Sequence, residues 1–130
     1  MARYLEHSEV LVIHARIIDE TGGAHGVRDT NLVLSITGRP QMTFGGKELY
    51  HGIFHKAAAY FESCALHHAF VDGNKRTAIA LAARFLHLNR YELVASNKQV
   101  EKFVLAAVTK KYSLEIIAEW LKKHSVARQS

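Results

Sequence analysis

Ten consecutive residues in the middle of the chain combine a potential base, a carboxylate, a glycine and two cations, in the order His68-Ala69-Phe70-Val71-Asp72-Gly73-Asn74-Lys75-Arg76-Thr77. Helical patterns flank this 68–77 segment, from Leu49 to Leu66 and from Ala78 to Leu88, so it should form a loop that starts the second helix. A helix N-terminus attracts anions but disfavours cations, by roughly 0.3–1 kcal/mol each. A bound polyphosphate would make cations at this helix N-terminus favourable. Lys75 and Arg76 at this position therefore predict a phosphate site.

The residues between the base and the cations fit the same interpretation. Asp72 could ligate Mg²⁺, which typically takes one or two carboxylates together with phosphate oxygens and water. Taken by itself, an aspartate here would more often be a helix cap. Gly73 permits a positive φ or a close approach to a ligand, and Asn74 could cap the helix or orient a phosphate, although a plain turn explains that pair equally well. Because Lys75 and Arg76 lie next to these residues and at a helix start, we interpret them as phosphate ligands and not as solvated charges.

His68 is the candidate base, because a histidine can take the proton of an attacking hydroxyl near neutral pH. A histidine at a helix end is also commonly a partner of the helix dipole or a polar group of the core. Phe70 should pack the loop onto the core and so fix the direction of His68. His51 and His55 have the i, i+4 spacing of a metal pair, but no glutamate stands in an HExxH arrangement, so we interpret them as exposed.

The rest of the chain predicts an all-α bundle of about six helices. Alanine-rich Ala78 to Ala83 is apolar nearly all round, which is typical of a central helix. The stretch from Pro40 to Gly46 should be a flap, extended or hairpin, with strand structure at most in this region, near residues 40–48. The remaining helices are indicated by apolar spacing or capping residues, from Glu6 to Glu20, from Asp29 through Ile36 to Gly38, after Ser96 with Gln99, and after Ser113.

Composition sets the remaining expectations. With 130 residues, 48% of them hydrophobic and 22% charged, the chain should form a single domain over residues 1–130. It shows neither a signal-peptide pattern nor an apolar run long enough for a membrane, so we expect a cytoplasmic protein. The only cysteine, Cys64, lies on an apolar helical stripe and should pack in the core. The net charge of +5 suits an acidic partner, without distinguishing nucleic acid, nucleotide or an acidic protein segment.

The 68–77 segment resembles the signature of the Fic/Doc superfamily, His-x-Phe-x-Asp/Glu-Gly-Asn-x-Arg. Lys75, where the larger Fic branch usually has glycine, and the following Arg76-Thr77-Ala78 resemble the Doc branch, the "death on curing" toxins of toxin–antitoxin pairs. Similarity at Gly26-Val27-Arg28-Asp29 and at Arg39-Pro40 extends the resemblance over most of the chain. It implies the compact helical Fic/Doc fold.

The resemblance also implies a role for each site residue. His68 would deprotonate a target hydroxyl, and Asp72 would bind Mg²⁺. Gly73 and Asn74 would form an anion nest, and Lys75 with Arg76 would hold the phosphates of ATP. Fic enzymes transfer AMP to a protein hydroxyl, whereas Doc proteins transfer the terminal phosphate to a threonine of elongation factor Tu and halt translation. Lys75 would favour the second outcome, because its side chain fills space that glycine leaves to the phosphates.

The family resemblance implies two protein partners, elongation factor Tu as the target and a small antitoxin as the inhibitor. Glu20 and Glu119 lack the Ser/Thr and Gly/Asn neighbours of the inhibitory helix found in many Fic proteins, so restraint should come from another chain. Three alternatives stay open: an adenylyltransferase, a basic non-catalytic helical module that binds nucleic acid or protein, and a histidine-based metal phosphohydrolase. The leading hypothesis expects no direct binding of nucleic acid and no membrane.

Overall fold

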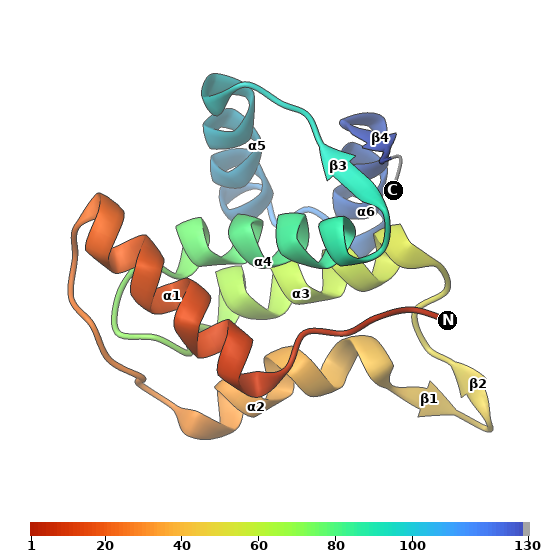
Figure 1. The fold of residues 1–130 in the computed structure, drawn as a ribbon, viewed down its shortest axis with the longest axis horizontal. Helices are drawn as coiled ribbons and strands as arrows, with labels where there is room; N and C mark the ends of the chain where they lie inside the picture. The colour runs from red at the N-terminus through yellow and green to blue at the C-terminus, as the bar shows by residue number, and fades with distance from the viewer. Residues whose placement is uncertain (129–130) are drawn as a thin grey trace.

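The structure, a computed structural model, describes residues 1–128, in which six α-helices and two small antiparallel strand pairs occur (Figure 1). The predicted fold class, mostly helical and compact, is confirmed. The helices are α1 (His7–Thr21), α2 (Thr30–Gly38), α3 (Ile53–His67), α4 (Asn74–Leu88), α5 (Asn97–Thr109) and α6 (Leu114–Lys123), with a 3₁₀ turn at Arg39–Gln41. The strands are β1 (Thr43–Phe44), β2 (Lys47–Glu48), β3 (Tyr91–Leu93) and β4 (Ser125–Ala127).

Helices α3 and α4 lie side by side at the centre and run in opposite directions (Figure 1). Both are rich in alanine, which lets the two backbones approach closely. Helices α1 and α2 pack on one side of this pair and α5 and α6 on the other (Figure 1). Nine residues of α3 are buried, so the predicted central helix, α4, shares the centre with α3.

Most helix starts agree with the capping residues in the sequence. The Asp29 side chain accepts hydrogen bonds from the backbone N–H groups of Asn31 and Leu32 and starts α2. Ser96 and Gln99 form the predicted reciprocal capping box of α5, and Ser113 caps α6. These caps satisfy N–H groups that a helix leaves without internal partners, which explains why the helices begin where they do.

Two predictions about local structure are wrong. Helix α3 begins at Ile53 and not at Leu49, because Gly52 takes a left-handed φ of 82° at the N-cap. The strands are not confined to the flap, because β3 pairs with β4, which lies more than 30 residues further along the chain. The hairpin predicted for the flap is confirmed, with Thr43 opposite Glu48.

No helix in residues 1–128 combines the length and the apolar character that crossing a membrane requires.

Cys64 of α3 lies in the hydrophobic core, as predicted, and its thiol donates to the backbone carbonyl of Asn74 at 3.4 Å. Burial raises the pKa of the thiol to about 12. Because the thiolate is the reactive form, native protein at pH 8 should not react with a thiol-specific disulfide reagent until it unfolds. Absorbance of the released thiol, measured with and without denaturant, tests this expectation. Rapid reaction of the native protein would contradict it.

Candidate active site

The loop between α3 and α4 is held from outside by the segment that joins α1 to α2. We call this segment, residues 22–29, the strap; Figure 1 shows it (orange) beside the loop. Val27 of the strap forms an isolated antiparallel bridge with Phe70. The backbone N–H of Val71 donates to the carbonyl of Gly26 at 3.0 Å, and that of Arg28 donates to the carbonyl of Ala69 at 2.8 Å. The first part of the loop, from Ala69 to Val71, is therefore paired with the strap as a short strand would be.

Arg28 also binds the end of α3. Its Nε donates to the carbonyl of His68 at 2.6 Å and its Nη2 to the carbonyl of His67 at 3.1 Å. A cation at a helix C-terminus is favourable, and these carbonyls have no partner within the helix. His68 follows the last helical residue with a left-handed φ of 51°. This turn takes His68 out of the helix, and the residue is exposed.

The inner side of the loop is anchored by aromatic packing and an amide. Phe70 is 1% exposed and stacks on the ring of His14, with ring centroids 3.8 Å apart. The Asn74 side chain accepts from the backbone N–H of Phe70 and donates to its carbonyl, both at 3.0 Å. Phe70 thus has the anchoring role expected of it. The amide of Asn74 is turned into the loop, so only its backbone N–H remains to face an anion.

Asp72 presents an ionised carboxylate. Its Oδ1 accepts from the N–H of Gly73 at 2.8 Å and its Oδ2 from the N–H of Ala24 at 3.1 Å. These two hydrogen bonds, with the nearby charge of Arg76, hold the pKa of Asp72 below its usual range. The N-cap of α4 is Gly73 and no side chain caps this helix, so Asp72 does not have the capping role that was the alternative.

One cleft of about 300 Å³ collects all six residues that the sequence singles out for chemistry. Val71 joins them in its lining, which otherwise consists of His68, Asp72, Gly73, Asn74, Lys75 and Arg76. Lys75 is exposed, and none of the ion pairs found in residues 1–128 involves it. The first turn of α4 borders the same cleft, with N–H groups that have no partner within the helix. The cleft therefore offers positive charge and donors on one side and a base at its edge.

Arg76 links this cleft to the end of α1. Its Nη1 donates to the hydroxyl of Thr21 and, at 3.0 Å, to the carbonyl of Gly22, and its Nη2 lies 3.7 Å from Oδ1 of Asp72. A guanidinium has five N–H groups, so further donors remain for a phosphate. Arg76 thus fixes the strap against the loop while still bordering the cleft.

The Fic/DOC family model matches residues 4–86, which contain α1, the strap and the whole 68–77 segment. The chain belongs to the Fic/Doc family. It is 37% identical over 132 residues to a protein named Toxin Doc from Mycolicibacterium smegmatis (strain ATCC 700084 / mc(2)155), covering 100% of this chain and 99% of that protein. It is 29% identical over 121 residues to Protein kinase doc from Escherichia phage P1, covering 93% and 94%. Both relatives belong with the Doc branch indicated by Lys75.

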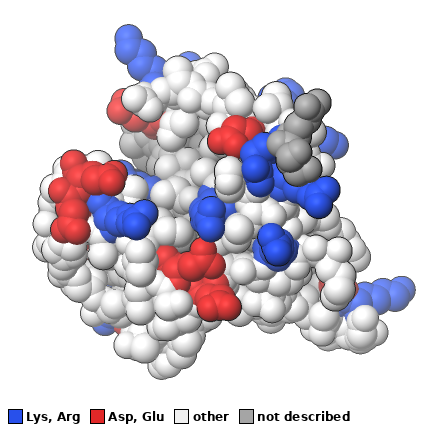
Figure 2. Space-filling view, viewed as in Figure 1, with Lys and Arg blue, Asp and Glu red and all other residues white. Residues whose placement is uncertain are grey.

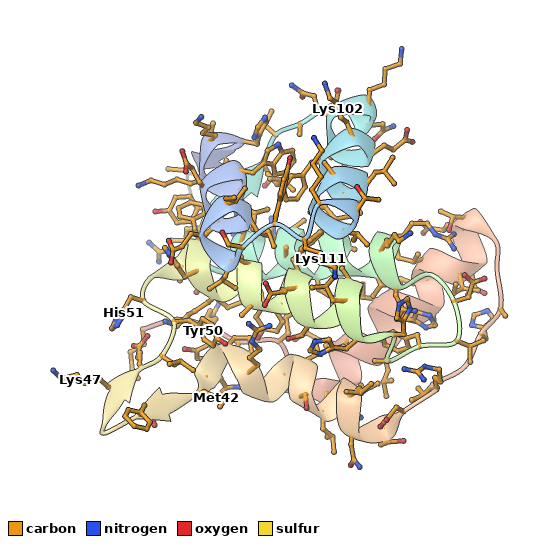
Figure 3. The ribbon with its side chains drawn as sticks, turned by 180° about the vertical axis from the view of Figure 1, so that it is seen from behind. Met42, Lys47, Tyr50, His51, Lys102 and Lys111 are labelled. Carbon is orange, nitrogen blue, oxygen red and sulfur yellow. The ribbon has the colours of Figure 1, made fainter. Side chains whose placement is uncertain are left out.

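Of the two other stretches that resemble the family, Gly26 to Asp29 belongs to the strap beside the loop, whereas Arg39-Pro40 lies away from this cleft. The guanidinium of Arg39 binds the Tyr50 hydroxyl and the Glu62 carboxylate, both at 2.6 Å, and ties the flap to α3. Figure 3 labels Tyr50 and His51 at the hairpin end of the molecule, opposite the end with α1 and the loop. His51 is exposed, as predicted, whereas His55 is half-buried and its Nε2 lies 2.8 Å from the carboxylate of Glu115.

Sequence reasoning missed two contributors to this Fic/Doc site. His14 is buried and binds the loop, and Gly23 lies so close to Asp72 that a Cβ built there would be 2.6 Å from Oδ2. Gly23 gives no local signal beyond a helix end. His14 does, because it stands between Val10 and Ile18 at steps of four, on the buried stripe of α1.

Proposed function

We propose that this protein is the toxin of a toxin–antitoxin pair and transfers the terminal phosphate of ATP, with Mg²⁺, to a threonine hydroxyl of elongation factor Tu. The observation that carries the proposal is the convergence of His68, the ionised Asp72 and two cations on one cleft at a helix N-terminus. The names of the relatives, a toxin and a protein kinase, support the same assignment.

The residues of the cleft fit a magnesium nucleotide. Within residues 1–128 no group of three or more His, Cys, Asp or Glu side chains could hold a metal by itself. Mg²⁺ suits a cleft with a single carboxylate, because it binds through one or two carboxylates together with phosphate oxygens and water. Asp72 would hold it, and its chemical contribution would be to neutralise charge on the phosphates. A cleft of about 300 Å³ is at the small end of ligand sites and has room for the phosphates.

The chain's own residues would then divide the work of transfer. Lys75, Arg76 and the N–H groups at the start of α4 would hold the phosphate oxygens and stabilise the charge that they share in the transition state. His68, exposed at the edge of the cleft, would accept the proton of the incoming threonine hydroxyl. Catalysis would come from positioning and electrostatics, which is how phosphate transfer is generally accelerated.

The position of Lys75 supports phosphate transfer over AMP transfer. Its side chain borders the cleft beside Gly73, where it adds charge and removes space. The relative named Protein kinase doc supports the same outcome. Adenylyl transfer to a protein hydroxyl is the second candidate, because the 68–77 segment fits the signature of both branches.

An antitoxin is the partner that this proposal requires. The contacts of Arg76 within residues 1–128 are Thr21, Gly22 and Asp72, so its only carboxylate partner there is the one expected to bind metal. No glutamate of that part of the chain pairs with this arginine, so inhibition of phosphate transfer would come from a separate protein. The net charge of +5 suits an acidic segment of such a protein.

Incubation with labelled ATP separates the two reactions. Purified protein, elongation factor Tu and Mg²⁺ are mixed with ATP labelled at either the γ- or the α-phosphate. We expect the γ-label on elongation factor Tu and no α-label, and mass spectrometry should find one added phosphate on a threonine. Transfer of the α-label, with an added AMP, would instead establish the second candidate. Absence of both labels from active, folded protein would overturn the proposed reaction.

Two further alternatives receive less support. Acidic and basic side chains are interspersed on the face in Figure 2, which does not present one continuous basic surface for nucleic acid. A histidine-based phosphohydrolase would need several metal ligands close together, and no such group occurs in residues 1–128.

A further inference from the structure

A single buried histidine connects α1 to the loop that carries Asp72. His14 is 4% exposed, and its Nε2 lies 2.8 Å from the backbone carbonyl oxygen of Asp72. Its ring stacks on Phe70 with an interplanar angle of 6°. Val10 and Ile18, one turn away on either side, are apolar and buried. His14 is thus the one polar residue among the three buried residues of α1, and it contacts the loop at two points.

The hydrogen bond has a fixed direction. A carbonyl oxygen can only accept, so the Nε2 atom of His14 carries the proton and donates it. The bond exists whether the imidazole is neutral or charged, because Nε2 bears a hydrogen in both states. The bond is favoured because His14 is buried, and a buried N–H group without a partner would cost about 1–3 kcal/mol.

This bond restricts the direction of the Asp72 side chain. The carbonyl of Asp72 and the N–H of Gly73 belong to the same planar peptide unit. His14 holds the carbonyl end of that unit, and the N–H end donates to the carboxylate of Asp72 at 2.8 Å. With Phe70 fixed two residues earlier, the peptide has little freedom to rotate, and the carboxylate is kept at the cleft.

We infer that His14 is a positioning residue of the phosphate-transfer site, which holds the Asp72 peptide so that the carboxylate meets the metal of the magnesium nucleotide. The inference rests on the proposed function for the identity of that ligand. His14 does not line the cleft and takes no part in proton transfer. Groups that orient a metal-binding side chain typically change metal affinity or activity by 10–100-fold when they are removed.

Three substitutions separate this role from simple filling of the core. His14→Phe keeps an aromatic ring on Phe70 but removes the donor. His14→Gln loses the ring but places an amide nitrogen about where Nε2 lies, whereas His14→Asn has the same amide one methylene too short. If the donor matters, Gln should preserve the site and both Asn and Phe should not.

Two measurements are made on each variant. Hydrogen exchange at the amides of Val71 and Gly73 reports how firmly the loop is held, without any nucleotide. The Mg²⁺ concentration that gives half-maximal phosphate transfer reports how well the carboxylate is presented. For His14→Phe and His14→Asn we expect faster exchange at Gly73 and a Mg²⁺ requirement raised roughly 10-fold or more, with His14→Gln close to wild type.

The outcomes separate this inference from the proposed function. Should His14→Phe keep both wild-type values, or should Gln and Asn lose them equally, the positioning role is overturned. Altered exchange with an unchanged Mg²⁺ requirement would also overturn it, since the loop would then be held for stability alone. If the wild type transfers no phosphate, the proposed function fails, while exchange in the Gln and Asn pair still decides whether the donor fixes the loop. Thermal unfolding identifies a variant that does not fold, and the Gln and Asn pair then gives the answer.

Discussion

Replacing His68 by asparagine is expected to lower the rate of phosphate transfer by roughly 10²–10⁴-fold, the usual contribution of a general base. His68 is the histidine that lines the cleft, and asparagine cannot accept the threonine proton. Asparagine is preferred to alanine because position 68 has a left-handed φ of 51°, which asparagine adopts more readily. Nucleotide affinity should change little. Single-turnover transfer of the γ-label, with ATP binding measured separately, gives the two values.

The neighbouring histidine provides the control. His67 is also exposed and its carbonyl also binds Arg28, but its side chain lies on a different groove, with Leu32, Ser35 and Met42. His67→Asn should therefore transfer phosphate at nearly the wild-type rate. Equal losses in the two variants would mean that the effect comes from the end of α3 and not from a base. A rate unchanged in His68→Asn would remove the base from the proposed mechanism.

The parts of the structure that were predictable from the sequence depend on residues close together in the chain. Three helices are capped by side chains that bind backbone groups two or three positions away, namely those of Asp29, Ser96 and Ser113. Neighbouring residues therefore determine where each of these helices begins. The cleft was predictable for the same reason, since its chemical residues fall within the 68–77 segment and the helix start brings them together. Phe70 was correctly assigned to the core because a large aromatic side chain in a polar loop is most stable when it packs on the interior.

The contacts that support the site could not be predicted, because they join distant segments. Arg28 binds the end of α3 across 40 residues, Ala24 binds Asp72 across 48, and His14 binds Asp72 across 58. Only tertiary packing places the strap against the loop. The start of α3 was missed for a related reason. Leu49 and Tyr50 continue the apolar spacing of the helix, but the hairpin and the left-handed Gly52 take them out of it.

The strap makes a second large effect predictable, at a residue without a side chain. Gly23→Ala should reduce phosphate transfer roughly 10–100-fold, comparable to the loss of a group that orients a metal ligand. The new Cβ would lie 2.6 Å from Oδ2 of Asp72 and 3.3 Å from Cδ1 of Ile18, which is buried. Ile18 cannot easily yield, so the carboxylate would turn away and lose the hydrogen bond from Ala24. A raised Mg²⁺ requirement, measured at saturating ATP, would show the displacement.

Backbone strain must be separated from this clash, since Gly23 also has a φ of 116°, where alanine is disfavoured by about 1–3 kcal/mol. Gly46→Ala is the control, because Gly46 has a φ of 78°, open space around it and a place in the hairpin at the other end of the molecule. Both variants should have a lower free energy of unfolding, but only Gly23→Ala should lose activity per folded molecule. If both keep full activity at a temperature where they are folded, Asp72 tolerates the contact and the strap does not determine where its carboxylate lies. Loss of activity in Gly23→Ala alone would show that the close approach of strap and loop serves catalysis and not only stability.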